Sequence, residues 1–300
     1  MTGPRTTVIV PCWNDGRFVR DAVASVRRQD RPVRVVVVDD GSTDPETQAA
    51  LADLERDSVR VIRQRNRGVS GARTVALNAA DTEFVLALDA DDVLVDGVLG
   101  AMIDALDANP QAAAAWGDQS AFGADDYVNP AWPTLDPWLI TYMNRISVTA
   151  LYRREALEEV GGWTLEDGYE DWDVWLALAE KGWSGAHIGR PHLRYRQHHG
   201  SDAAARGLAR DRERHDDVTR LLRDRHPNLF TARRWTRGES IAPRAIRWAF
   251  SAIDAIPRIG DARRHRLHDL ALRALMPSMR PLVDGRRQAG PLGNVLRRLR

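Results

Sequence analysis

Cysteine, lysine and long apolar runs are scarce in this 300-residue chain, and each scarcity excludes something. Cys12 is the only cysteine, so no disulfide can form within the chain and a reducing cytoplasm is the expected compartment. The most apolar stretch, from Phe84 to Met102, is broken by four aspartates and is unsuited to span a bilayer. The first residues lack the charged start and apolar core of a secretion signal.

Charge is distributed unevenly along the chain. Residues 1–200 carry 20 basic and 31 acidic side chains, whereas residues 201–300 carry 23 and 11. Lys181 is the only lysine, so the basic tail is built from arginine. A GC-rich coding bias explains the choice of arginine but not its concentration in the last third. The tail is therefore expected to contact an anionic surface, such as the inner face of the cell membrane, or another subunit in a homo-oligomer.

Short β-branched runs alternate with helix-period segments in the first half, which predicts an α/β fold with a mostly parallel sheet flanked by helices. From about Ala203 the pattern changes to Arg-rich helical segments without strands. The predicted strands are Thr7–Val10, Arg34–Val38, Val59–Ile62, Phe84–Leu88 and Ala112–Trp116, and the predicted helices are Phe18–Arg28, Pro45–Arg56, Ser70–Ala80, Val98–Leu106, Arg153–Val160 and Glu170–Lys181.

Three carboxylate clusters stand at predicted strand ends or at a helix start, where α/β sheets place their ligand sites. The first, Asp39-Asp40 followed by Gly-Ser-Thr-Asp44, suits either a binding crevice or a turn with a helix N-cap. The second, Asp89 to Asp92, follows an apolar strand, so repulsion and desolvation favour a divalent cation such as Mg²⁺ or Mn²⁺ over a solvated turn.

The third cluster, Glu170, Asp171 and Asp173, lies in a first helical turn. Carboxylates there are stabilised by the helix dipole, which is the simple explanation. The functional one is a general base at the edge of a pocket, with Trp163, Tyr169 and Trp172 nearby to hold a substrate ring. Trp172 is equally suited to the core.

Six motifs in order resemble those of family 2 glycosyltransferases of the GT-A fold, over about residues 6–201. Each is weak alone, but their order and spacing make a specific signal. The resemblance implies a Rossmann-like catalytic domain over residues 1–202, with residues 1–110 on the nucleotide-sugar side and 111–202 on the acceptor side, and a basic helical extension over 203–300. The motifs are Val8–Asn14, Val38–Asp44, Asn66–Arg73, Leu88–Asp92, Glu170–Leu176 and Tyr195–Ser201.

The resemblance also implies roles for single residues. Asp40 would bind the base, Arg73 would approach the donor diphosphate, and Asp171 would deprotonate the acceptor. Asp91 would be the main metal ligand, with Asp89 and His198 beside it, although His198 equally suits a plain surface position. Glu170 joins the three aromatic residues as an acceptor contact. The other residues expected to bind the donor are Pro11, Trp13, Asn14, Gly68, Asp89 and Ala90.

The implied reaction is one in-line displacement that transfers a sugar with inversion from a nucleoside-diphosphate donor, UDP-linked in preference to dTDP- or GDP-linked. The acceptor would be a saccharide, a lipid-linked glycan or a natural product, as in bacterial cell-wall or polysaccharide synthesis. Thr74 stands where many relatives have asparagine. The absence of a Gln-x-x-Arg-Trp motif favours single transfer over polymerisation.

Two other functions stay open. A nucleotidyltransferase would more often carry a Gly-rich, Lys-containing loop, which Pro11–Phe18 lacks. A catalytically silent nucleotide-sugar binder would be expected to lose Asp171 or the Asp89/Asp91 pair. No aromatic stacking motif or zinc spacing supports nucleic-acid binding. For the tail helices Pro243–Ile256 and Ala262–Met276, packing on the catalytic domain or a second subunit is favoured over a membrane-facing stripe.

Overall fold

The computed structural model describes residues 3–124, 126–166, 168–198, 212–279, 282–283 and 286–287. Its sheet begins with four parallel strands in the order β3-β2-β1-β4. Alternate side chains of the central strand β1 face opposite cores: Val8 and Val10 pack with α1, α2 and α4, whereas Ile9 packs with α3. The elements are β1 (Thr6–Cys12), α1 (Gly16–Arg27), β2 (Val33–Asp39), α2 (Pro45–Arg56), β3 (Arg60–Arg63), α3 (Gly68–Asn78), β4 (Phe84–Ala87) and α4 (Leu99–Ala108).

The second half of the sheet is mixed. β8 lies antiparallel between β4 and β6, and the long strand β9 pairs parallel with β6 and antiparallel with β5. β9 can pack this closely on β6 only with glycine at position 185, because a Cβ there would lie 2.2 Å from the Trp116 ring. The elements are β5 (Val93–Leu94), β6 (Ala112–Gly123), β7 (Tyr127–Asn129), η1 (Leu139–Thr141), β8 (Leu151–Arg153), α5 (Arg154–Glu159), α6 (Glu170–Glu180) and β9 (Ser184–Gln197).

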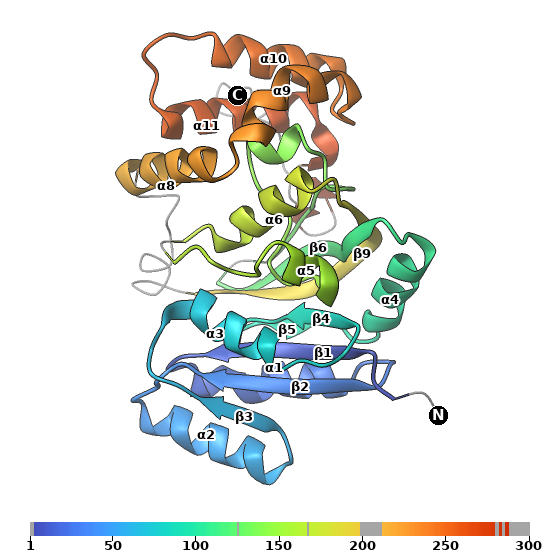
Figure 1. Cartoon of the computed structure of the whole chain (residues 1–300), viewed down its shortest axis with the longest axis vertical. Coiled ribbons are helices and arrows are strands. Elements are labelled where there is room, and N and C mark those ends of the chain that lie inside the picture. The colour runs from blue at the N-terminus through green and yellow to red at the C-terminus, as the bar shows by residue number, and fades with distance from the viewer. Residues whose placement is uncertain are drawn as a thin grey trace.

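The C-terminal helices stack at the end of the molecule opposite β3 and α2 (Figure 1). They pack on the preceding α/β part of the chain, as favoured from the sequence: Ile246 and Phe250 of α10 are fully buried, and Phe250 stacks on Trp138 at 5.6 Å between ring centroids. None of the described helices combines the length and hydropathy that crossing a bilayer requires. The elements are α8 (Arg212–Arg225), α9 (Pro227–Glu239), α10 (Arg244–Asp254), α11 (Asp261–Leu275), η3 (Pro277–Met279), β10 (Leu282–Val283) and β11 (Arg286–Arg287).

Two expectations for this region were wrong. The tail is not free of strands, since β10 pairs with β7 and with β11. In α11, the sequence pattern places Leu267, Leu270, Ala271 and Ala274 on one apolar stripe, but Leu270 is exposed, and His268 and Leu272 are buried instead. The predicted boundary at residue 202 lies outside the described residues.

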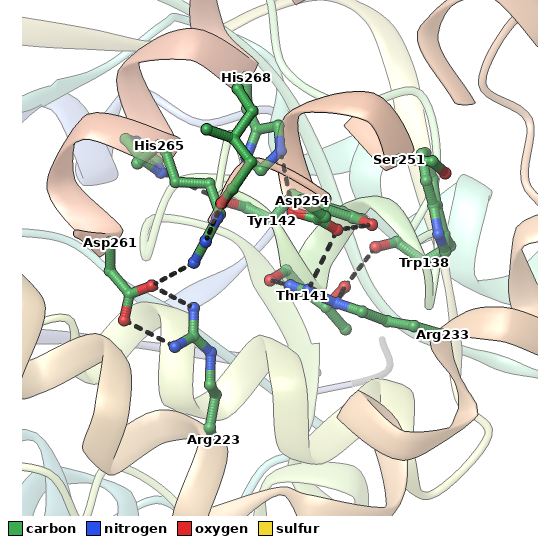
Figure 2. Close-up of polar contacts among 12 residues, drawn as sticks. Trp138, Thr141, Tyr142, Arg223, Arg233, Ser251, Asp254, Asp261, His265 and His268 are labelled. Carbon is green, nitrogen blue, oxygen red and sulfur yellow. Dashed lines mark hydrogen bonds and ion pairs between the residues drawn. The ribbon is translucent and has the colours of Figure 1, made fainter. Parts of the chain in front are cut away.

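Polar contacts hold the tail to the α/β part of the chain (Figure 2). Arg233 donates from Nε to Thr141 Oγ1 at 2.7 Å, and Tyr142 donates to Asp254 Oδ2 at 2.9 Å. Within the tail, Arg223 and Asp261 form a salt bridge at 2.6 Å. Buried polar groups are costly unless they are paired, so these pairings fix the tail in one position.

Candidate functional site

The first part of the site lies where β1 and β2 end. Asn14 follows β1 in a left-handed backbone conformation, with φ of 55°. Its side-chain oxygen accepts from the backbone N–H groups of Thr43 at 2.9 Å and Asp44 at 3.0 Å. Asn14 therefore joins two of the predicted nucleoside-binding motifs. Beside it, Trp13 is 55% exposed and offers a ring to solvent, whereas Pro11 is buried in β1.

The two aspartates that end β2 serve different contacts. Asp39 accepts from Ser42 N at 2.9 Å and so shapes the turn. Asp40 accepts from Gln64 Nε2 at 2.6 Å and from Arg67 N at 2.8 Å, which ties β2 to the segment before α3. Asp44 caps α2 by accepting from Thr47 N at 2.9 Å. The turn-and-cap interpretation of this cluster is confirmed for the first and last of these aspartates, and base binding by Asp40 stays a prediction.

Cys12 lies at the last position of β1, directly beneath these loops. Its backbone oxygen accepts from Asp40 N at 2.9 Å. The side chain is buried, and this burial raises the pKa of the Cys12 thiol to about 12. The thiol is therefore protonated at neutral pH and takes part in packing.

Gly68 begins α3 with φ of 73°, in the left-handed region that favours glycine. A Cβ at this position would meet nothing within 4 Å, so the requirement comes from the backbone and not from space. Ala90, predicted at the donor site as well, is buried between two aspartates.

The aspartates after β4 point to different partners. Asp91 Oδ2 lies 2.8 Å from His198 Nε2, and Asp92 Oδ1 accepts from Arg196 N at 2.8 Å. Asp92 is buried, and this burial raises its pKa well above the ordinary range. A solvated turn, the alternative for this cluster, is therefore wrong for Asp92.

Arg73 joins this cluster to the start of α6. The side chain is buried, with one terminal nitrogen 2.6 Å from Asp89 Oδ1 and the other 2.7 Å from Glu170 Oε1. Although burial acts against the charge, the two carboxylates raise the pKa of Arg73. Its Nε has no hydrogen-bond partner. Both terminal nitrogens hold carboxylates and the guanidinium is buried, so direct contact of Arg73 with a diphosphate stays a prediction.

Asp171, the predicted base, occupies the first turn of α6. Asn144 donates to its Oδ2 at 2.8 Å, and the Trp172 backbone donates to its Oδ1 at 2.7 Å. Burial, followed by the neighbouring charge of Glu170, raises the pKa of Asp171 to about 7. A carboxyl with that pKa can accept and release a proton at neutral pH.

Two of the predicted acceptor residues lie in the core. Trp163 is 1% exposed, and Trp172 is 4% exposed with its indole nitrogen donating to Ile140 O at 2.6 Å. Neither ring presents a face to a sugar: the core alternative holds for Trp172, and Trp163, which was expected only as an acceptor contact, lies in the core as well. Tyr169 is half-buried, and its hydroxyl lies 2.8 Å from His215 Nδ1 in α8. Glu170 is held by Arg73, as above.

Two of the three predicted metal ligands lie together. The Asp91 and His198 donor atoms are as close as ligands of one cation, whereas Asp89 turns to Arg73. Among the described residues, no group of three or more His, Cys, Asp or Glu side chains is arranged to hold a metal. Two protein ligands still suit Mg²⁺ or Mn²⁺, because such ions usually complete their shell with water and substrate phosphates.

Sequence reasoning missed Asn144 and Arg196. Asn144 belongs to the irregular stretch before β8, where no periodicity or motif marks it. Arg196 lies inside a recognised motif, yet its contact with Asp92 is made by the backbone, which no residue type reveals.

Comparisons with known proteins identify the fold and the family. The fold is similar to that of S. aureus TarS residues 1–349 in complex with UDP-GlcNAc, at TM-score 0.60 and 18% identity over 94% of this chain and 95% of that one. It is also similar to the mannosyltransferase PcManGT from Pyrobaculum calidifontis in complex with GDP-Man and Mn²⁺, at TM-score 0.51 and 21% identity over 99% and 80% of the two chains. Residues 7–161 match the family described as Glycosyl transferase family 2, and the chain belongs to that family.

Its curated relatives resemble only part of it. A GalNAc(5)-diNAcBac-PP-undecaprenol beta-1,3-glucosyltransferase of Campylobacter jejuni is 32% identical over 33% of this chain and 34% of its own length. The succinoglycan biosynthesis protein ExoW of Rhizobium meliloti is 41% identical over 30% of each. The aligned part is thus about a third of these relatives or less.

Proposed function

We propose that this protein transfers a single sugar, with inversion, from a nucleoside-diphosphate sugar to an acceptor, using a divalent cation and Asp171 as the general base. One observation carries the proposal. Asp171 has a pKa of about 7 and is adjacent to Glu170, which Arg73 joins to Asp89 at the end of β4. The proposed base, Asp171, and the proposed cation-binding carboxylate, Asp89, are therefore held in one arrangement.

Asp91 and His198 would hold the cation, with Asp89 at its edge. When bound, such a cation would neutralise charge on the leaving diphosphate. The neighbouring structures with UDP-GlcNAc, and with GDP-Man and Mn²⁺, support a nucleotide-sugar donor and a divalent ion for this chain. A UDP-sugar is the first choice, with GDP- and dTDP-sugars as alternatives.

Asp171 would accept the proton from the attacking acceptor oxygen. The hydrogen bond from Asn144 to Asp171 Oδ2 favours one orientation of the carboxylate. The acceptor hydroxyl would meet the carboxylate in that orientation. Attack on the anomeric carbon opposite the diphosphate inverts the configuration at that carbon.

The relatives point to the acceptor class. One acts in building an undecaprenol-linked saccharide and another in succinoglycan synthesis, so we favour a growing or lipid-linked saccharide as acceptor.

A panel of UDP-, GDP- and dTDP-sugars, measured by thermal shift and calorimetry with and without Mn²⁺, tests the proposal. One nucleotide class should raise Tm in a Mn²⁺-dependent way, and Asp171→Asn should keep this binding while losing transfer. Binding of nucleoside triphosphates with release of pyrophosphate would instead indicate a nucleotidyltransferase. Donor binding with neither sugar transfer nor slow hydrolysis of the donor would indicate a catalytically silent binder.

A further inference from the structure

Two tryptophans of the tail are largely exposed to solvent. Trp235 of α9 is 69% exposed and Trp248 of α10 is 70% exposed. Such large apolar side chains lower the free energy of the folded chain when they are buried, and neither is used in that way here. Single exposed apolar residues are common on proteins, but two tryptophans on adjacent helices need a further explanation.

The core does not account for Trp248. The apolar residues of α10 that pack inward are Ile246 and Phe250, which join the buried cluster of the α/β part of the chain. Trp248 lies between them in sequence and projects from the other side of the helix. The stripe considered from the sequence as a membrane contact is thus internal, and a different face of the same helix is left apolar.

Arginines accompany both tryptophans. The Arg234 guanidinium lies 4.6 Å from the Trp235 ring centroid, and that of Arg237 lies 5.2 Å from the Trp248 ring. Arg247 donates to the backbone oxygens of Arg237 and Gly238, which holds α9 and α10 together. We call Arg234, Trp235, Arg237, Ile241, Arg244 and Trp248, which come from α9, α10 and the turn between them, the Trp–Arg surface; Ile241 is exposed and Arg237 is half-buried.

The charge of this region has one sign. Residues 227–253 contain five arginines, and Glu239 is their only acidic residue. A two-fold contact between two copies through this surface would place arginines against arginines, which disfavours self-association. An anionic bilayer complements both features, because its headgroups attract arginine and its interface accommodates tryptophan.

We propose that the Trp–Arg surface docks this protein on an anionic lipid bilayer. The tryptophan rings insert at the headgroup level, and Arg234, Arg237 and Arg244 contact the lipid phosphates. The helices α9 and α10 lie at the end of the molecule opposite α2 and β3, so docking through them would leave the proposed donor-binding loops away from the membrane (Figure 1).

Flotation of the full chain with vesicles tests the proposal. The chain should float with phosphatidylglycerol/phosphatidylcholine vesicles, float far less with phosphatidylcholine alone, and lose binding as salt is raised. Trp235→Ala/Trp248→Ala should abolish most of the binding. Arg234→Gln/Arg237→Gln/Arg244→Gln should weaken it by about a hundredfold, given the usual contribution of a basic residue near an anionic surface.

Matched controls separate docking from folding. Trp13→Ala removes an exposed tryptophan from the other end of the chain, 55% exposed, and should float like the parent. All variants should keep a Tm close to that of the parent, because the altered side chains are exposed or half-exposed. The proposal is overturned if the parent does not bind anionic vesicles, if both multiple variants float as it does, or if neutral vesicles bind equally. Concentration-dependent dimerisation that the tryptophan variant loses, without vesicle binding, would assign the surface to a second copy.

Discussion

Tyr169 and His215 share a 2.8 Å hydrogen bond that joins the start of α6 to the first described helix of the tail. Tyr169 has a left-handed backbone, with φ of 57°, and immediately precedes Glu170 and Asp171. Burial lowers the pKa of His215, which keeps this histidine neutral at pH 7. Further along α6, Asp173 accepts from Arg225 and His226 at 2.8 and 2.9 Å. The tail therefore fixes the helix that carries the proposed base.

Tyr169→Phe should lower kcat several-fold more than it changes KM. The substitution keeps the ring packed on Trp172 but removes the hydrogen bond to His215, so the backbone before Asp171 loses a constraint. Stability should fall by about 1 kcal/mol. Tyr142→Phe is the control, because the hydroxyl that it loses bonds to Asp254 of α10 in the same interface. Equal losses of kcat in the two variants would contradict a positioning role.

Transfer activity should rise with pH and level off above about 7, because Asp171 has its pKa there and acts only when deprotonated. The pKa is raised from the ordinary 3.8, so the folded chain binds this proton more tightly than the unfolded chain. Stability contributed by the protonated form is therefore lost as pH rises from about 4 to about 7. Asp171→Asn should be inactive, and its Tm should exceed that of the parent at pH 8 but not at pH 4.

His198→Ala should remove most of the Mn²⁺ dependence of donor binding. His198 lies 2.8 Å from Asp91, and the loss of one of the two proposed ligands should weaken a site that the substrate would complete. His187→Ala is matched to it, since His187 pairs with Asp118 at 3.0 Å away from the site. Calorimetric titrations with and without Mn²⁺ that are alike for the two variants would show that His198 is not a ligand.

Arg73→Met should destabilise the chain by about 3–5 kcal/mol, because it leaves Asp89 and Glu170 without the buried charge that compensates them. Adding Glu170→Gln should restore part of this loss by removing one of the two carboxylates. Arg5 provides the surface comparison: it bridges Glu83 and Asp107 at 2.7 Å each but is 40% exposed. Arg5→Met should cost about 1 kcal/mol or less in urea denaturation.

Gly16→Ala should destabilise the chain by a few kcal/mol and weaken donor binding. A Cβ at Gly16 would lie 2.3 Å from Thr47 Cα, and backbone cannot move aside as a flexible side chain does. Because α1 and α2 would separate, the loops that they hold would shift. Gly238→Ala, in the last turn of α9, meets nothing within 4 Å and should raise stability by less than the roughly 0.5–1 kcal/mol of a mid-helix position. The same measurements on both variants separate steric cost from helix propensity.

The parallel half of the fold could be predicted because its signals are local. Its strands are short runs of β-branched residues, and α2 occupies the predicted residues because Asp44 caps it and Pro45 starts it. β9 was missed for the opposite reason. Its fourteen residues include four arginines or histidines in exposed or half-exposed positions, and its partner β6 lies about 70 residues away. Strand identity there comes from pairing, which no local pattern encodes.

The site divides in the same way. Its carboxylates could be named from the sequence because motif order marks them. That Arg73 would join Asp89 to Glu170 could not, since these two partners lie 16 and 97 residues away. The burial of Trp163 and Trp172 was equally out of reach, because an aromatic residue beside a helix start suits a pocket wall and a core alike.

Cys12, buried at the end of β1 with its thiol protonated, makes the chain convenient for spectroscopy. Maleimide and iodoacetamide reagents react with thiolates, so the native thiol should stay unmodified under conditions that label an exposed cysteine. A cysteine introduced in place of Trp235 or Leu221 would then carry a fluorophore or spin label at one known position. Distances between such probes and a membrane or a bound nucleotide could be measured without first removing a residue from the sheet.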